Sequence, residues 1–318
     1  MAAELPKPRA TREAYGDALL KLGGLHEDIV ALDADLSGST KSGKFGGAFP
    51  DRFFNVGIAE ANMMNMAAGL AVGGKIPYAS TFAVFATGRA FDQVRQSIAQ
   101  PNLPVRICAS HGGITVGEDG CSHQSVEDIG LMRMLPNMRV VVPADYNQAY
   151  AAVMESYVLP GPIYIRMGRP VVPPLYENTP SGLGSGADIL RPGSDISLFA
   201  CGIMAAKALA AADELKKRDI SAEVVNISVL KPIDEETVVD SLSRTGCAVT
   251  AEEHSIIGGL GGAISQVASE HIPVRIGRLG LRDVFGKSGL PDQLLEEFHL
   301  TARHLAELSG LVLQSKGC

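Results

Sequence analysis

Two segments of the sequence carry the side chains best suited to acid–base and polar chemistry, and the first contains Glu60. This glutamate begins the apolar stretch EANMMNMAAGLAV and is flanked by Ile58, Ala59 and Ala61. Apolar surroundings disfavour the charged form of a carboxyl group, so Glu60 is a candidate proton donor. A carboxylate in the first turn of a helix is also commonly a partner of the helix dipole. The residues alone leave both roles open.

The second segment is the glycine-rich stretch SHGGITVGEDGCSH, which follows the apolar run VRICAS. It contains two histidines, His111 and His123, and two acids, Glu118 and Asp119. In open α/β sheets, loops at the carboxyl ends of strands line the ligand crevice. A single histidine is more often structural, but this combination on a flexible loop predicts a polar substrate site.

Phe82 and Phe85 lie three residues apart in STFAVF and would share one face if this segment were helical. Core packing is the default interpretation of such a pair. The alternative is a flat wall for a planar cofactor ring, because aromatic faces pair well with planar heterocycles.

The turn GGLGG at 258–262 follows a predicted strand and begins a predicted helix, which is where phosphate cradles occur. A dinucleotide site would also need an acidic residue at the end of a strand about 20 residues further on. That region reads PVRIGRLG, so close packing of strand against helix is the favoured interpretation.

Short apolar runs alternate with helical stretches along the chain, which is typical of a parallel sheet covered by helices. We therefore predict the α/β class, with two doubly wound domains whose sheets are mostly parallel. The Pro-, Gly- and Ser-rich segment VVPPLYENTPSGLGSGADILRPG separates them. The predicted division is a first domain at 1–172, a linker at 173–192 and a second domain at 193–318. Strands are expected at 29–32, 105–109, 140–142 and 163–165, and helices at 60–72 and 88–99.

Composition narrows the functional classes. The chain has 318 residues and a formal net charge of -7, which argues against sequence-independent binding to nucleic acid. No run of about 18 uncharged apolar residues suggests a membrane span, and MAAELPKPRATREAYG lacks the apolar core of a signal peptide. A cytoplasmic protein is expected. The five cysteines form no CxxC pair, so neither a zinc site nor a disulfide framework is predicted.

Four runs carry a family resemblance: DADLSGST, NVGIAEANM, STFAVF and SHGGITVGEDGCSHQSVEDIGLMRMLPNM. In this order they resemble the C-terminal half of transketolase, and the match covers nearly the entire chain. The resemblance implies the pyrimidine-binding domain of a thiamine diphosphate enzyme followed by the family's C-terminal domain. The implied reaction moves a two-carbon ketol unit from a ketose phosphate to an aldose phosphate, in the pentose phosphate pathway.

The resemblance also implies roles for individual residues. Glu60 matches the glutamate that hydrogen-bonds N1′ of the cofactor's aminopyrimidine, and His111 matches a histidine near the substrate carbonyl. Other cofactor-pocket residues implied are Asp35, Leu36, Ile58, Phe82 and Phe85. The implied substrate ligands are Asp119, on a sugar hydroxyl, and the phosphate-end residues Arg12, Ser39, His123 and Arg166.

Two departures from the family pattern stand out. The tyrosine that usually follows the phenylalanine pair is replaced by Thr87-Gly88-Arg89. No GDG motif followed some 30 residues later by an asparagine occurs, and this is the family signature for Mg²⁺ and the diphosphate. We therefore expect no metal ligands in this chain and a larger partner chain that supplies them. The chain would be the small subunit of a split transketolase, with a homodimer core within a heterotetramer.

Three other functions remain open at this point. Deoxyxylulose phosphate synthase shares the same domains and the Glu252-Glu253-His254 segment, and the beta subunit of a 2-oxo-acid dehydrogenase is a further relative. His111 and Glu118 fit transketolase better than either. A non-catalytic regulatory subunit is a different class, but it would have no need of Glu60 together with both histidines and both arginines.

Overall fold

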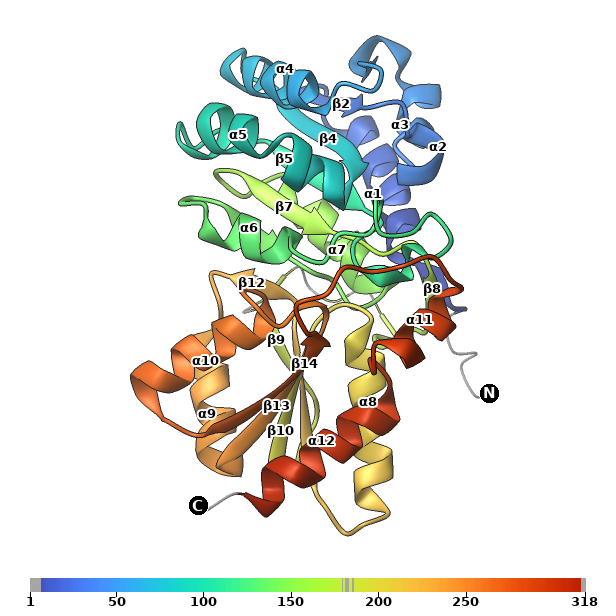
Figure 1. Cartoon of the computed structure of the whole chain (residues 1–318). Helices are drawn as coiled ribbons and strands as arrows, with labels where there is room; N and C mark the ends of the chain where they lie inside the picture. The colour runs from blue at the N-terminus through green and yellow to red at the C-terminus, as the bar shows by residue number, and fades with distance from the viewer. Residues whose placement is uncertain (1–6, 179, 181–182, 185, 316–318) are drawn as a thin grey trace, which may run out of the picture.

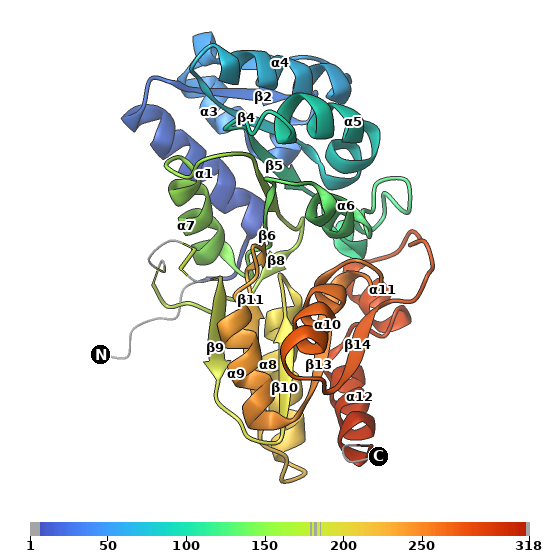
Figure 2. The same cartoon turned by 90° about the vertical axis from the view of Figure 1, so that its left-hand side faces the viewer.

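The computed structural model describes residues 7–178, 180, 183–184 and 186–315. Within these ranges the strands form a seven-stranded, a five-stranded and a two-stranded sheet. Helices cover both faces of the two larger sheets (Figures 1 and 2). This confirms the predicted α/β class with mostly parallel sheets.

The N-terminal domain is built on the seven-stranded sheet, in the order β12-β6-β7-β5-β4-β2-β3. Its strands are β2 (Ile29–Asp33), β3 (Phe53–Asn55), β4 (Ile76–Phe82), β5 (Arg106–Ser110), β6 (Arg139–Val141), β7 (Ile163–Arg166) and β12 (Val229–Lys231). One face is covered by α1 (Thr11–Leu25) and α7 (Tyr146–Ser156), and the other by α4 (Glu60–Val72), α5 (Phe91–Gln93) and α6 (Asp128–Met134) (Figure 1).

The C-terminal domain is built on the five-stranded sheet, in the order β14-β13-β10-β11-β9. Its strands are β9 (Ala187–Arg191), β10 (Ile196–Ala200), β11 (Ala222–Ile227), β13 (Cys247–Ser255) and β14 (Arg275–Leu281). Helices α8 (Met204–Lys216) and α12 (Ala302–Gln314) lie on one face, with α9 (Glu235–Thr245) and α10 (Leu260–His271) on the other (Figure 2).

The domain division differs in two ways from the one predicted. Strand β9 lies inside the segment predicted as linker and pairs antiparallel with β11 at the sheet edge. Strand β12 comes from the second half of the chain but pairs antiparallel with β6 of the N-terminal sheet. One hydrophobic core also includes residues of both halves, for example Tyr164 and Phe199. The two domains are therefore joined through a sheet edge and a shared core.

The remaining elements are short. They are β1 (Arg9–Ala10) and β8 (Val171–Val172), which pair with each other, helices α2 (Ser37–Thr40), α3 (Gly43–Ala48) and α11 (Pro291–Glu297), and the helical turns η1 (Pro50–Arg52), η2 (Phe85–Arg89), η3 (Val94–Ala99) and η4 (Ile114–Val116). The predicted helix at 88–99 is thus split among η2, α5 and η3.

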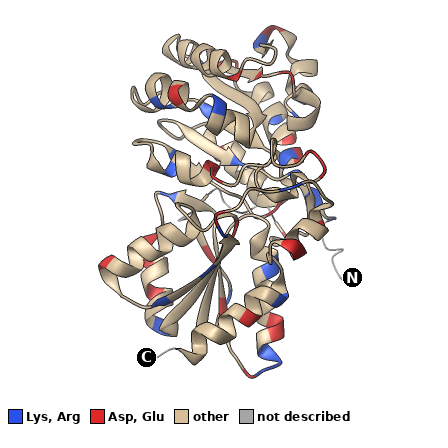
Figure 3. Cartoon of the chain, viewed as in Figure 1, with Lys and Arg blue, Asp and Glu red and all other residues tan. Residues whose placement is uncertain are grey.

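Charged residues of both signs are spread over both domains (Figure 3). Within the described ranges, no helix combines the length and the apolar character that crossing a bilayer requires.

Candidate active site

The residues singled out from the sequence gather at the carboxyl edge of the N-terminal sheet. Asp35 and Leu36 follow β2, Phe82 ends β4, and His111 follows β5. These three strands are parallel neighbours, with Asp33 opposite Ser80 and Phe82 opposite Ser110. Because parallel strands bring their carboxyl ends to one edge, residues distant in sequence meet there, as expected of ligand crevices in open α/β sheets.

Glu60 is the first residue of α4, and its side chain is only 2% exposed. Nη1 of Arg89 lies 2.9 Å from both of its carboxylate oxygens. Arg89 belongs to η2 and is 50% exposed, and its guanidinium also lies over the Phe85 ring, 4.2 Å from the centroid. Sequence reasoning noted Arg89 as a departure from the family pattern but gave it no partner. A buried carboxylate beside a ring face therefore faces a single half-exposed cation.

An aromatic wall stands next to this carboxylate. The Phe82 and Phe85 rings are nearly parallel, with centroids 5.9 Å apart. The His111 imidazole stacks on Phe82 at 3.8 Å, and His123 meets Phe85 edge-on at 5.4 Å. Phe82 ends a strand and Phe85 begins a helical turn, so the two rings come together without the continuous helix considered above.

His111 is held neutral by its surroundings. It is buried, its φ is 61°, and its Nδ1 lies 2.9 Å from the Ser110 hydroxyl. Burial, with Arg12 and Arg169 as the next contributions, lowers the pKa of His111 to about 3. At neutral pH the ring is therefore an uncharged hydrogen-bonding group.

Four basic residues lie around His111, and we call them the cationic cluster: Arg12, Lys41, His123 and Arg169. Arg12 Nη1 donates to the Ser39 carbonyl at 2.8 Å. Among the described residues, Arg12 Nε is a buried donor without a hydrogen-bond partner. A donor left unpaired among like charges is suited to a bound anion.

Two family models match the chain: the transketolase pyrimidine-binding domain over residues 7–174 and the transketolase C-terminal domain over residues 185–305. The chain belongs to the transketolase family. It is 46% identical to a transketolase C-terminal section of Methanocaldococcus jannaschii, covering 94% of this chain and 95% of that one. It is 44% identical to a 6-deoxy-6-sulfo-D-fructose transketolase subunit of Clostridium sp. strain MSTE9, covering 96% and 95%.

Solved structures agree with this family membership. A split-gene transketolase, described as an inactive β4 tetramer, is 51% identical, with a TM-score of 0.91 and coverage of 97% of this chain and 99% of that one. The chain also matches about half of longer family members: a 1-deoxy-D-xylulose-5-phosphate synthase of Geobacter sulfurreducens is 36% identical over 95% of this chain and 48% of that protein.

Arg166 of this transketolase-family chain does not lie where the resemblance implied. Its side chain is 6% exposed, and its Nε donates to the buried Asp128 carboxylate at 2.7 Å. Its Nη2 donates to the carbonyls of Ser125 and Glu253 at 3.3 and 2.9 Å. A buried carboxylate thus holds Arg166 in the interior, which corrects its expected place among the phosphate ligands.

Arg169, three residues further on, was missed by the sequence reasoning. It donates to the Val116 carbonyl and lies 3.5 Å from Glu118 and 3.9 Å from Asp119. The repeated arginine in IRMGR was the available signal. Asp119 is therefore already beside a cation of the cluster, on the exposed side of the loop.

Asp35, Leu36 and Ile58 lie at the solvent side of the same edge. Asp35 has a φ of 64° and accepts a hydrogen bond from Asn55 at 3.2 Å. Ile58, two residues before the buried Glu60, is 77% exposed, which is high for an isoleucine. The exposed Ile58 leaves an apolar side chain available for a ligand or another chain.

The backbone N–H groups of the turn at 258–262 bind a carboxylate of the protein itself. The Glu252 carboxylate accepts hydrogen bonds from the backbone N–H groups of Leu260 and Gly261 at 2.6 and 2.8 Å. The N-terminus of α10 is thereby capped by the protein's own anion, in agreement with the packing interpretation. Within the described ranges, no group of three or more His, Cys, Asp or Glu side chains is arranged to hold a metal ion.

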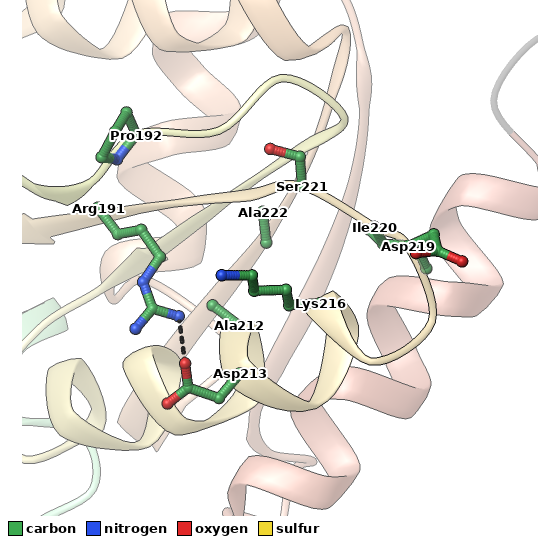
Figure 4. A pocket seen from close by; sticks show the side chains of 9 residues that line it. All are labelled: Arg191, Pro192, Ala212, Asp213, Lys216, Asp219, Ile220, Ser221 and Ala222. Atoms are coloured by element: carbon green, nitrogen blue, oxygen red, sulfur yellow. Dashed lines mark ion pairs between the residues drawn. The ribbon is translucent and has the colours of Figure 1, made fainter.

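A hollow of about 580 Å³ lies apart from this site, in the C-terminal domain (Figure 4). It is lined by residues of β9, α8 and the start of β11. Its arginine, Arg191, is paired with Asp213 at 2.8 Å, and its remaining cation is the surface residue Lys216. With its arginine neutralised and no aromatic wall among its lining residues, it does not compete with the carboxyl edge as a candidate active site.

Proposed function

We propose that this chain is one subunit of a thiamine diphosphate-dependent transketolase that moves a two-carbon ketol unit between sugars with anionic ends. The observation that carries the proposal is the meeting of Glu60, the Phe82–Phe85 wall and neutral His111 beside the cationic cluster. A proton-exchanging carboxylate, a ring-binding wall and an anion site are the separate requirements of this reaction, and here they share one edge.

The residues present fit the pyrimidine end of thiamine diphosphate. The buried Glu60 carboxylate could exchange a proton at N1′ of the pyrimidine, and the phenylalanine faces could pack on the ring. Asp35, Leu36 and Ile58 would line the entrance. When bound, the cofactor would supply the carbon nucleophile that carries the two-carbon unit.

We further propose that a larger chain supplies the ligands for Mg²⁺ and the diphosphate. The relatives that this chain matches from end to end are a transketolase C-terminal section and a subunit of a transketolase. The longer relatives carry additional sequence of similar length to the matched half. We also propose that the two chains form a heterotetramer built on a homodimer of this chain, and that it works in the cytoplasm.

The cationic cluster supports an anionic substrate end but not one particular anion. Phosphate and sulfonate both present several negatively charged oxygens to the same donors. The relative in Clostridium acts on a sulfonated fructose. We propose sugar phosphates as the substrates, with Arg12, Arg169 and His123 at the anionic end, the Ser39 segment beside them, and His111 and Asp119 toward the sugar.

A single reconstitution tests the proposed function. The chain is mixed with the larger transketolase-like subunit of its own organism, with and without thiamine diphosphate and Mg²⁺. Ketol transfer is then measured from fructose 6-phosphate, 6-deoxy-6-sulfofructose and uncharged fructose. We expect activity that requires both chains and the cofactor, and that prefers the phosphate. Preference for the sulfonated sugar would reassign the substrate, and the absence of transfer from all three would refute the function.

A further inference from the structure

We call the loop at residues 111–125 the substrate loop. Its own hydrogen bonds are too few to fix its backbone conformation. Four of its residues have positive φ: His111 at 61°, Gly113 at 88°, Gly117 at 88° and Gly120 at 75°. Its regular structure is the short turn η4 and isolated bridges of Gly112 and Gly113 to Ser125. A left-handed conformation costs free energy at a residue with a Cβ such as His111. Contacts from outside must therefore fix the loop.

Arg166 and Arg169 of the N-terminal domain supply some of those contacts, and the C-terminal domain supplies others. The Glu253 carboxylate accepts a hydrogen bond from the Thr115 backbone N–H at 2.6 Å. Gln124, near the other end of the loop, donates from Nε2 to the Lys287 carbonyl and to the Ile114 carbonyl, both at 2.9 Å. Just beyond the loop, the Ser255 N–H donates to the Val126 carbonyl at 2.7 Å. The end of β13 and the segment after β14 thus hold both arms of the loop.

Glu253 is the central contact of this set. Its side chain is 2% exposed, and a Cβ built on Gly113 would lie 2.2 Å from the Glu253 carboxyl carbon. The carboxylate therefore packs directly on the loop backbone, at a residue that must be glycine. Burial raises the pKa of Glu253, and the charge of Arg166 opposes this effect. The buried Arg166 thus supplies the positive charge beside both Glu253 and Asp128.

The neighbouring Glu252 offers a natural comparison. Successive side chains of a strand point to opposite faces, and Glu252 accordingly caps α10 instead of contacting the loop. Both glutamates are buried and both accept backbone N–H groups. They differ in what they hold: a helix of their own domain for Glu252, and the substrate loop of the other domain for Glu253.

We propose that Glu253 is a positioning residue for substrate binding, through which the C-terminal domain fixes the substrate loop without touching the sugar. This rests on the proposed function, which assigns the sugar to His111, Asp119 and His123. By holding Thr115 and Gly113 between His111 and Asp119, the carboxylate sets the separation of the two groups on which the sugar would lie. Releasing it should weaken substrate binding more than it affects the cofactor or the chemical step.

The test uses the two-chain enzyme and compares variants that shorten the Glu253 side chain with one that only removes its charge. Glu253→Ala and Glu253→Asp both withdraw the acceptor from Thr115, whereas Glu253→Gln keeps an oxygen in place but removes the charge. We expect the first two to raise KM for the ketose phosphate at least tenfold and fivefold, with kcat and half-saturating thiamine diphosphate changed less than threefold. Glu253→Gln should stay within threefold of wild type in KM. If KM stays near the wild-type value in Glu253→Asp but rises in Glu253→Gln, the charge of Glu253 rather than its positioning of the loop is responsible, and the proposal is wrong.

Glu252→Ala is the matched control, because it removes a buried carboxylate from the same strand. It should lower Tm while leaving KM within twofold, and an equal rise of KM in both alanine variants would overturn the proposal. Hydrogen exchange on the isolated chain gives a readout that does not depend on the enzyme's function. Amides at 113–117 should exchange at least tenfold faster in Glu253→Asp than in wild type or Glu252→Ala, and unchanged exchange there would refute the contact. Absence of ketol transfer by the wild-type mixture refutes the proposed function instead.

Discussion

Arg169→Ala tests whether the cationic cluster binds the charged end of the substrate. A charge-assisted hydrogen bond contributes about 1.5–3 kcal/mol, and Arg169 is 37% exposed, which favours the lower part of that range. Its present carboxylate neighbours lie at 3.5 and 3.9 Å, too long to compete strongly with a bound anion. We therefore expect kcat/KM for the phosphorylated ketose to fall about 10- to 30-fold, since 1.4 kcal/mol corresponds to about tenfold.

The assay is the ratio of kcat/KM on fructose 6-phosphate to that on fructose, measured in the reconstituted enzyme. Arg169→Ala should lower this ratio about tenfold, because an uncharged ketose has no anion to lose. Arg169→Lys keeps the charge but not the planar guanidinium group, so its ratio should lie between those of the wild type and Arg169→Ala. Equal losses on both sugars would show that Arg169 supports the loop through Val116 and would remove it from the proposed anion site.

Three further predictions concern buried residues of the N-terminal domain. Glu60→Gln should lower kcat of the two-chain enzyme at least 100-fold, because an amide cannot exchange a proton as a carboxyl group does; a loss under threefold would contradict the assignment. Between about pH 6.5 and pH 3 the unfolded chain protonates His111 while the folded chain does not, so stability should decrease as pH falls. From pH 7 to pH 5 the free energy of unfolding should decrease by about 2 kcal/mol less in His111→Gln than in the wild type, as measured by urea unfolding. Arg166→Met should destabilise the isolated chain by about 3–5 kcal/mol by leaving Asp128 without its charge partner, and a change below 1 kcal/mol would refute this.

Local patterns predicted part of the fold well. The helix at 60–72 appears as α4 with the same bounds, because a long apolar stretch of helix formers specifies a helix by itself. Strand β4 was not predicted, since IPYASTF contains a proline and two polar residues in succession. Its strand conformation comes from pairing with both β2 and β5, and the buried Ser80 hydroxyl is satisfied by Tyr15 at 2.5 Å. Those partners are distant in sequence, so no local pattern reveals them.

The candidate site shows the same limit. Glu60 and His111 could be chosen from their own neighbours in the sequence, whereas the choice between Arg166 and Arg169 could not. That choice depends on Asp128, which α6 places beside the end of β7. A buried carboxylate without a cation is costly, so the arginine within reach of Asp128 is retained in the interior and the next one is left for the site.

Arg89 presents a related problem that only the structure exposes. Its guanidinium contacts the Glu60 carboxylate and the Phe85 face, the two groups that the proposed function gives to the pyrimidine ring. The two ends of this ion pair are not equivalent: Arg89 is 50% exposed and Glu60 is 2% exposed. Arg89 can therefore return to water at small cost, whereas Glu60 needs another partner whenever Arg89 leaves. A pyrimidine nitrogen that shares its proton with Glu60 would be such a partner. Glu60 can therefore pair with Arg89 when the cofactor is absent and with the pyrimidine when it is bound, so the ion pair does not contradict the proposed cofactor contact.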